Sequence, residues 1–219
     1  MMLEERVRRF QRFDLDGGHP ALDFTNTVDW RGTEREYEWL ANPLDLAAWG
    51  LRVGLLSHEE AGELARSAVQ NPAQAARALS SARRLREALF RLFKALLERE
   101  EPQPEDLRLF NGQLRRALSR QSMQAPDSET HRAYRLGFLD EGDPLQRFLF
   151  RLLRQAAELL TTADAHRLKV CSTPECGWLF LDTTKNASRR WCDMASCGNR
   201  AKAQRFYRKK RLSESAAKS

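Results

Sequence analysis

With 219 residues, the chain is long enough for one large domain, or for a medium domain with a small module. Hydrophobic residues make up 42% and charged residues 31%, which excludes a globally disordered chain. No stretch approaches the roughly 20 apolar residues that span a bilayer. Residues 1–20 also lack the apolar region of a secretory signal, so we expect a cytoplasmic protein with no membrane partner.

The formal net charge of +7 is unevenly distributed. Residues 165–219 carry 13 Lys and Arg against 4 Asp and Glu, whereas residues 1–164 carry 24 against 26. A boundary near Thr161–Arg167 therefore separates a nearly neutral domain, 1–164, from a strongly basic one, 165–219. A polyanion is the natural partner of such a basic domain.

The first predicted helices lie between residues 20 and 70. Turn residues end at Gly18, and a helix is predicted to start near Pro20. Residues 44–56 have the pattern of an amphipathic helix. Ser57 then starts another helix, because Glu60 stands three positions later and completes a capping box.

A long helix is predicted from Asn71-Pro72 to about Glu101, with apolar residues at spacings of three and four. Another should cover residues 104–120. Residues 121–130 are polar and rich in turn residues. His131–Asp140 shows a short alternation of apolar residues, which is typical of a strand or a β-hairpin arm.

A last helix of this region is predicted from Asp143-Pro144 to about Thr162. We therefore predict a mainly α N-terminal domain with room for a short β-hairpin. Such a domain is expected to sense a ligand or to dimerise.

Four cysteines dominate the basic domain, with the spacing C-x4-C-x15-C-x4-C. Zinc prefers four tetrahedral thiolate or imidazole ligands, and structural sites fill all four positions. Free thiols, a redox pair and an iron–sulfur cluster are the alternatives. The identical spacing of the two pairs argues against free thiols, the absence of a C-x-x-C motif against a redox pair, and the predicted hairpin and basic helix around the cysteines against an iron–sulfur cluster. The pattern predicts one structural Zn²⁺ per chain. Its ligands would be Cys171, Cys176, Cys192 and Cys197.

The residues around the cysteines predict a treble-clef-like finger, in which a β-hairpin precedes a helix. Leu168–Cys171 and Trp178–Asp182 are expected to be its strands, and Asp193–Arg211 its helix. Its own core would be small: Val170, Trp178, Phe180, Trp191 and Phe206. Metal binding should therefore supply much of the folding free energy.

The helix of this finger is strongly basic. On a 3.6-residue period, one face is expected to pack on the hairpin, with Ala203, Phe206 and Tyr207. The flanks are expected to bind nucleic acid through Arg200, Lys202, Gln204, Arg205, Arg208, Lys209 and Arg211. The preceding loop would hold phosphates through Lys185, Arg189 and Arg190. A solvated helix face, an acidic lipid and an acidic protein remain as alternatives.

The tetrapeptide Cys197-Gly198-Asn199-Arg200, with Arg189–Cys192 and Cys176–Asp182 before it, resembles the CGNR zinc-finger family of bacteria. Residues 18–27 resemble the start of the helix-rich ABATE domain that accompanies this finger. The resemblance implies a stress-linked transcriptional regulator. Within the tetrapeptide we expect Gly198 to allow a close approach beside the metal, Asn199 to form local hydrogen bonds and Arg200 to contact phosphate or base.

A polar cluster near the N-terminus has two interpretations. It would either line a pocket for a small-molecule effector between helices, or cap helices and satisfy buried backbone groups. The candidate pocket residues are His19, Asp23, Asn26, Thr27 and Trp30.

No catalytic motif is evident, and the four histidines are scattered. We therefore expect no enzyme, although spatial clustering is not visible in a sequence. The leading hypothesis is a DNA-binding transcriptional regulator. The alternative is a zinc-stabilised adaptor or RNA-binding protein. Because one finger buries a modest interface, a homodimer or tandem binding on DNA is expected.

Overall fold

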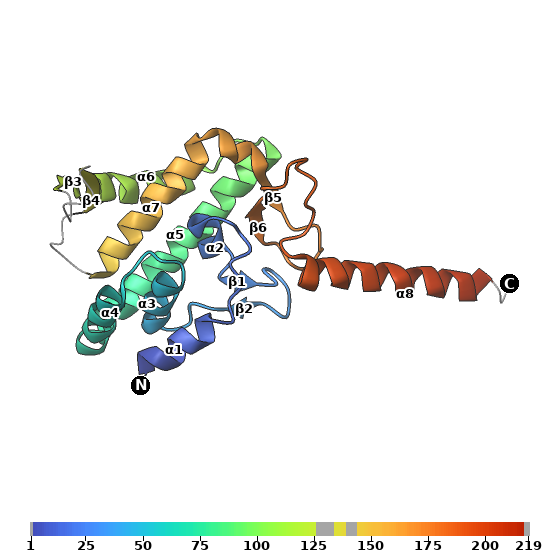
Figure 1. The fold of residues 1–219 in the computed structure, drawn as a ribbon, viewed down its shortest axis with the longest axis horizontal. Coiled ribbons are helices and arrows are strands. Elements are labelled where there is room, and N and C mark those ends of the chain that lie inside the picture. The colour runs from blue at the N-terminus through green and yellow to red at the C-terminus, as the bar shows by residue number, and fades with distance from the viewer. Residues whose placement is uncertain (1, 126–133, 139–143, 217–219) are drawn as a thin grey trace.

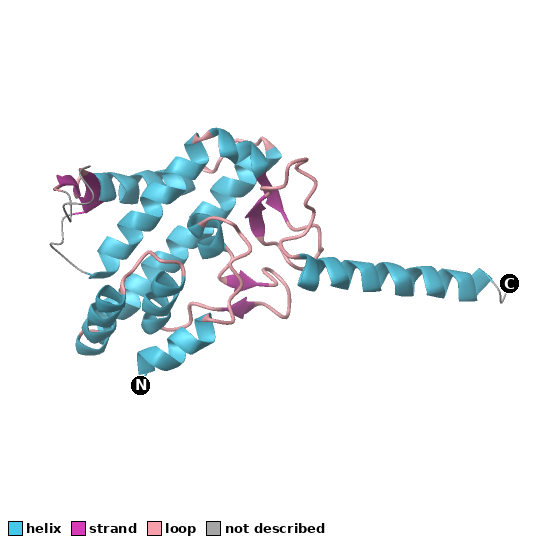
Figure 2. Ribbon diagram, in the orientation of Figure 1, coloured by secondary structure: helices cyan, strands magenta, loops and turns pink. Residues whose placement is uncertain are grey.

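The computed structural model describes residues 2–125, 134–138 and 144–216. Helices predominate, and the strands form three two-stranded antiparallel sheets (Figures 1 and 2). The N-terminal part contains α1 (Met2–Phe10), α2 (Pro20–Thr25), β1 (Val28–Asp29), β2 (Tyr37–Glu38), α3 (Pro43–Arg52), α4 (His58–Gln70), α5 (Pro72–Glu98), α6 (Pro104–Leu118), β3 (Gln121–Gln124), β4 (Arg135–Phe138) and α7 (Pro144–Thr161). After the short turn η1 (Ala163–Arg167) come β5 (Leu168–Val170), β6 (Leu179–Leu181), the helical turn η2 (Met194–Gly198) and α8 (Asn199–Ala216).

Helix starts follow the capping rules that the sequence indicates. The Ser57 side chain accepts a hydrogen bond from the backbone N–H of Glu60, and the Glu60 side chain accepts one from the Ser57 N–H. Pro72 opens α5, but the Asn71 side chain makes no capping hydrogen bond. The helix ends at Glu98, three residues before the predicted end, because Arg99 adopts the left-handed conformation with φ +56°.

Two segments differ from the sequence-based expectation. Residues 121–124 form β3, where a turn-rich stretch is predicted, because they pair with β4 from Gln121 opposite Phe138 to Gln124 opposite Arg135. The predicted strand His131–Asp140 is confirmed over 135–138, and its ends lie outside the described residues. The opening segment, for which no helix is predicted, is α1 and buries Phe10.

One hydrophobic core runs from the helical bundle into the C-terminal hairpin. It includes Phe24 and Trp49, whose ring centroids are 5.2 Å apart, and continues to Leu179 and Phe180 of β6. Figure 1 shows the β5–β6 hairpin against the bundle, whereas α8 extends away from every other element. The molecule is therefore mainly α, with a treble-clef-like finger whose hairpin shares the core of the body.

Candidate metal centre and nucleic-acid interface

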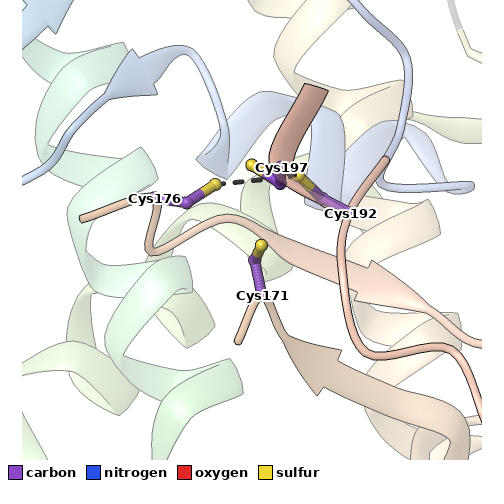
Figure 3. A group of neighbouring side chains, drawn as sticks. All are labelled: Cys171, Cys176, Cys192 and Cys197. Atoms are coloured by element: carbon purple, nitrogen blue, oxygen red, sulfur yellow. Dashed lines mark hydrogen bonds between the residues drawn. The ribbon is translucent and has the colours of Figure 1, made fainter. Parts of the chain in front are cut away.

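The four cysteines converge on one point from three segments. Cys171 follows β5, Cys176 ends the turn after it, Cys192 lies in the loop before η2, and Cys197 lies within η2. All are buried, and Figure 3 shows their sulfurs gathered together. One Sγ atom from each residue lies within 4.8 Å of the other three.

This arrangement fits zinc. The Sγ atoms of Cys176 and Cys192 are 3.6 Å apart, as are those of Cys192 and Cys197. Tetrahedral zinc, with Zn–S bonds of about 2.3 Å, separates its sulfur ligands by roughly 3.8 Å. Hydrogen bonding with the neighbouring thiols, Cys171 first, raises the pKa of Cys192 above its ordinary range. A cation between the sulfurs is what allows all of them to ionise.

Local geometry explains how the first two ligands reach one ion. The chain reverses direction after Cys171, where the backbone N–H of Cys176 donates to the carbonyl of Thr173 at 3.0 Å. Gly177 follows with φ +68°, a left-handed conformation that favours glycine. The Cys171 N–H donates to the carbonyl of Trp178 at 2.8 Å and closes the hairpin over the turn.

The loop between β6 and the third ligand is organised by Asp182, a fully buried carboxylate. It accepts hydrogen bonds from Lys169 Nζ at 2.7 Å, from the Arg189 backbone N–H at 2.7 Å and from the Thr184 backbone N–H at 3.0 Å. Burial opposes ionisation, but these hydrogen bonds prevail and hold the pKa of Asp182 below its usual range. The two threonines after Asp182 are a local signal for such a turn.

Arg189, expected to hold phosphate, lies against the protein instead. Its guanidinium lies 4.5 Å from the Phe180 ring centroid. Its Nε donates to the carbonyl of Trp191 at 3.0 Å, and its Nη2 donates to the carbonyl of Asp16 at 3.1 Å. These contacts link the finger loop to the N-terminal region, so we leave Arg189 out of the proposed nucleic-acid surface.

Apart from Arg200, the other expected nucleic-acid residues are exposed wherever their side chains are described. Arg200 is half-buried at the start of α8, and the exposed ones are Lys185, Arg190, Lys202, Gln204, Arg205 and Arg208. Lys209 and Arg211 belong to α8, but their side chains lie outside the described part. The structure therefore gathers most of this set along one projecting helix (Figure 1).

The expected packing of α8 on the hairpin is wrong. Phe206 and Tyr207 are 65% and 60% exposed, and Val170, another expected core residue, is 39% exposed. The reason lies in the hairpin, because Leu179 and Phe180 already bury their side chains in the core of the body. Leu179 and Phe180 are therefore not available as packing partners for the aromatic face of α8.

Within the tetrapeptide before α8, glycine and asparagine have local roles. A Cβ atom on Gly198 would lie 2.5 Å from Sδ of Met194, so the close approach is to that side chain. The Asn199 side chain donates to the carbonyl of Ala195 at 3.0 Å, which confirms the expected local hydrogen bond. Arg200 is the next residue, so this turn sets its backbone position at the start of α8.

The candidate pocket residues in and next to α2 use their polar groups within the chain. His19 caps the helix, since its Nδ1 accepts from the Ala21 N–H at 3.2 Å, and burial lowers its pKa. The Asp23 carboxylate accepts from the Gly17 N–H at 2.9 Å, and burial raises its pKa to about 7. The Thr27 hydroxyl donates to a helix carbonyl, that of Phe24, at 2.7 Å.

Asn26 pairs with the hairpin through both ends of its amide. Its Nδ2 donates to the Leu179 carbonyl at 2.8 Å, and its Oδ1 accepts from the Leu179 N–H at 2.9 Å. Both residues are buried. These contacts favour a structural role for Asn26. Of the five candidates, only Trp30 lines the cavity beside the metal centre, which is described below.

Comparison with family models agrees with this geometry. The ABATE model, described as "Putative stress-induced transcription regulator", matches residues 18–163. The chain belongs to the ABATE family. A second model, the CGNR zinc finger, matches residues 167–210, directly after the ABATE region. The resemblance drawn from the sequence is confirmed, and the four clustered cysteines of the finger fit one structural zinc ion.

A search of curated proteins found no match to the chain. Neither matching family is an enzyme family. No helix in the described part of the chain is long and apolar enough to span a membrane. Within this framework, Asn26 of the ABATE region and Leu179 of the finger join the two family segments through a buried pair of hydrogen bonds.

Proposed function

We propose that the chain is a zinc-dependent, DNA-binding transcriptional regulator. The finger contacts DNA through α8 and the loop before η2, and the ABATE region senses a signal or dimerises. The observation that supports DNA binding is the projection of α8 from the body, with the side chains of Lys202, Arg205 and Arg208 exposed. Its 18 residues correspond to a rod of about 27 Å, and B-DNA offers a major groove about 12 Å wide.

The electrostatics of α8 support the same proposal. No ion pair among the described residues involves Arg200, Lys202, Arg205 or Arg208. Unpaired guanidinium and ammonium groups on one helix attract phosphates without first losing an internal partner. The zinc centre fixes the root of this helix, so the charges have a defined position relative to the body.

The test is a triple substitution, Arg200→Ala, Arg205→Ala and Arg208→Ala, in the zinc-loaded full chain. Removing three phosphate contacts should weaken duplex binding and reduce the slope of log affinity against log salt by about 2 to 3. The matched control replaces three exposed arginines of α6, Arg108, Arg115 and Arg116, and should leave both quantities unchanged. Unchanged affinity in the α8 triple variant would remove the helix from the interface.

A second candidate function is RNA binding, or an adaptor role on an acidic partner. It is favoured by the aromatic pair Phe206–Tyr207, whose exposed rings lie 5.6 Å apart beside the basic residues. Exposed aromatic rings stack on unpaired bases, worth about 1–3 kcal/mol per base. Sequencing the nucleic acid that co-purifies at low salt separates the candidates: an enriched duplex favours DNA, whereas RNA or no nucleic acid favours the second candidate.

Dimerisation on DNA stays a prediction of the same proposal, because a single finger buries a modest interface. Light scattering after size exclusion, with and without an enriched duplex, measures the stoichiometry. Two chains per duplex are expected, and one chain per duplex would contradict the prediction.

A further inference from the structure

A cavity of about 180 Å³ lies between the ABATE region and the finger. The loop after α1 lines it with Arg12, Asp14 and Asp16, and the β1–β2 segment lines it with Asp29, Trp30 and Trp39. The finger contributes Cys176, Trp178, Cys192, Ser196, Cys197 and Arg200. Four sulfurs within 4.8 Å of one another enclose one ion, so most of this space is not the zinc position. It is smaller than the pockets of about 300–1,000 Å³ that hold drug-sized ligands.

Three carboxylates line the cavity, and two of them, those of Asp14 and Asp16, make no hydrogen bond or ion pair in the described part of the chain. Burial, followed by the charges of Asp193 and Asp14, raises the pKa of Asp16 to about 6, although the charge of Arg189 acts in the opposite direction. Asp29 differs, because its carboxylate accepts from Trp39 Nε1 at 2.8 Å. A half-buried, unpaired carboxylate is stabilised by a cation that enters beside it.

The carboxylates do not form a metal site. In the part of the chain that the structure describes, only the four cysteines form a group of three or more potential ligands close enough for one metal ion. Three of the other lining residues are aromatic, Trp30, Trp39 and Trp178, and two are basic, Arg12 and Arg200. Indole rings attract cations over their faces. The chain already uses Trp30 in this way, since the Arg35 guanidinium lies 5.5 Å from its ring centroid.

We propose that this cavity binds a small organic cation, an ammonium or guanidinium group on a compact apolar body. Carboxylates alone would suit a hard metal ion, and indole rings alone would suit an apolar molecule. Their combination selects a soft, polarisable cation. The proposal deepens the proposed function, because it places the signal-binding site at the junction of the two regions, away from the polar groups of α2.

Arg200 connects this site with α8. Its side chain lines the cavity, and it occupies the second position of the projecting helix. A bound cation adds positive charge beside the Arg200 guanidinium, so repulsion favours contact of that guanidinium with phosphate outside the cavity. Ligand binding should therefore raise the DNA affinity, and by linkage DNA should raise the ligand affinity by the same factor.

The first experiment is calorimetric titration of the zinc-loaded full chain with choline, agmatine and 3,3-dimethylbutan-1-ol, the uncharged isostere of choline. At least one cation should bind saturably, at least about tenfold more tightly than the alcohol. Magnesium chloride serves as the metal probe and should give no saturable heat. If neither cation binds, or if no cation binds more tightly than the alcohol, the proposal is wrong.

The variants are Asp14→Asn and Asp16→Asn, combined, with Glu34→Gln as the matched control. Glu34 is an exposed carboxylate of the β1–β2 connection that does not line the cavity. The double variant should bind the cation about tenfold more weakly at unchanged zinc content and melting temperature, whereas the control should bind normally. Normal binding in the double variant would overturn the assignment.

A DNA titration with and without choline, at matched ionic strength, separates this proposal from the proposed function. If choline strengthens duplex binding severalfold, the result supports both the proposed function and the cavity assignment. Cation binding in a chain that binds no duplex refutes DNA binding and leaves the cavity assignment standing. Duplex binding by a chain that binds neither cation refutes the cavity assignment alone.

Discussion

The hairpin and the helix of the finger are neighbours in sequence, yet their surroundings are opposite. On β6, Leu179 and Phe180 are fully buried, and Leu179 is hydrogen-bonded to Asn26 of the ABATE region. On α8, Phe206 and Tyr207 are mostly exposed. The finger is therefore anchored to the body on one side and presents a free surface on the other.

This difference changes the role of the metal. Zinc in a free-standing finger would stabilise only its own module. Here the hairpin that carries two ligands also completes the core of the bundle, so metal binding and the stability of the ABATE region are thermodynamically coupled. Substitutions on the anchored side should lower the stability strongly. Substitutions on the free side should weaken binding and leave the stability almost unchanged.

The largest expected effect is that of metal loss. Cys192→Ser removes a buried ligand, and the protein should lose stoichiometric zinc by elemental analysis. Structural zinc contributes on the order of 10 kcal/mol to the folding of small fingers. Because β6 belongs to the common core, helices of the ABATE region should also melt at a lower temperature, as seen by circular dichroism. An unchanged helical transition in the zinc-free variant would show that the finger is an independent unit.

The second-largest expected effect comes from replacing one phenylalanine by alanine on the anchored hairpin, compared with the same change on the exposed helix. Phe180→Ala should destabilise the protein by about 3–5 kcal/mol in urea denaturation, since it opens a cavity in the core. Phe206→Ala should change stability by less than about 0.5 kcal/mol, because the ring is exposed. Similar losses in both variants would mean that α8 packs on the body in solution.

Local parts of this structure are readable from the sequence. The capping box of Ser57 and Glu60 needs only residues three apart, and the cysteine pairs need only turns of four residues. The candidate zinc site and most helices follow from such short-range rules. The start of α5 at Pro72 is another example.

The unpredicted features depend on long-range contacts. Asn26 and Leu179 are 153 positions apart, so nothing near Asn26 shows that its amide pairs with a strand instead of lining a pocket. Because the side chains of that strand are already buried in the body, Phe206 does not pack on them, although its helical spacing predicts a packed face. The acidic and aromatic cavity likewise combines Asp16 with Trp178, which no local pattern connects.

The smallest expected effect comes from replacing one of two asparagines, the buried Asn26 or the exposed Asn199, by alanine. Asn26→Ala leaves the buried N–H and carbonyl of Leu179 without partners, which should cost about 2–4 kcal/mol of unfolding free energy. Asn199→Ala removes one exposed local hydrogen bond, to the carbonyl of Ala195, and should cost less than about 1 kcal/mol. Zinc content should stay stoichiometric in both variants, because neither residue is a ligand. Equal costs in urea denaturation would show that the amide pair does not join the finger to the ABATE region. A larger cost for Asn26→Ala at full zinc occupancy would show that this joint stabilises the protein independently of the metal.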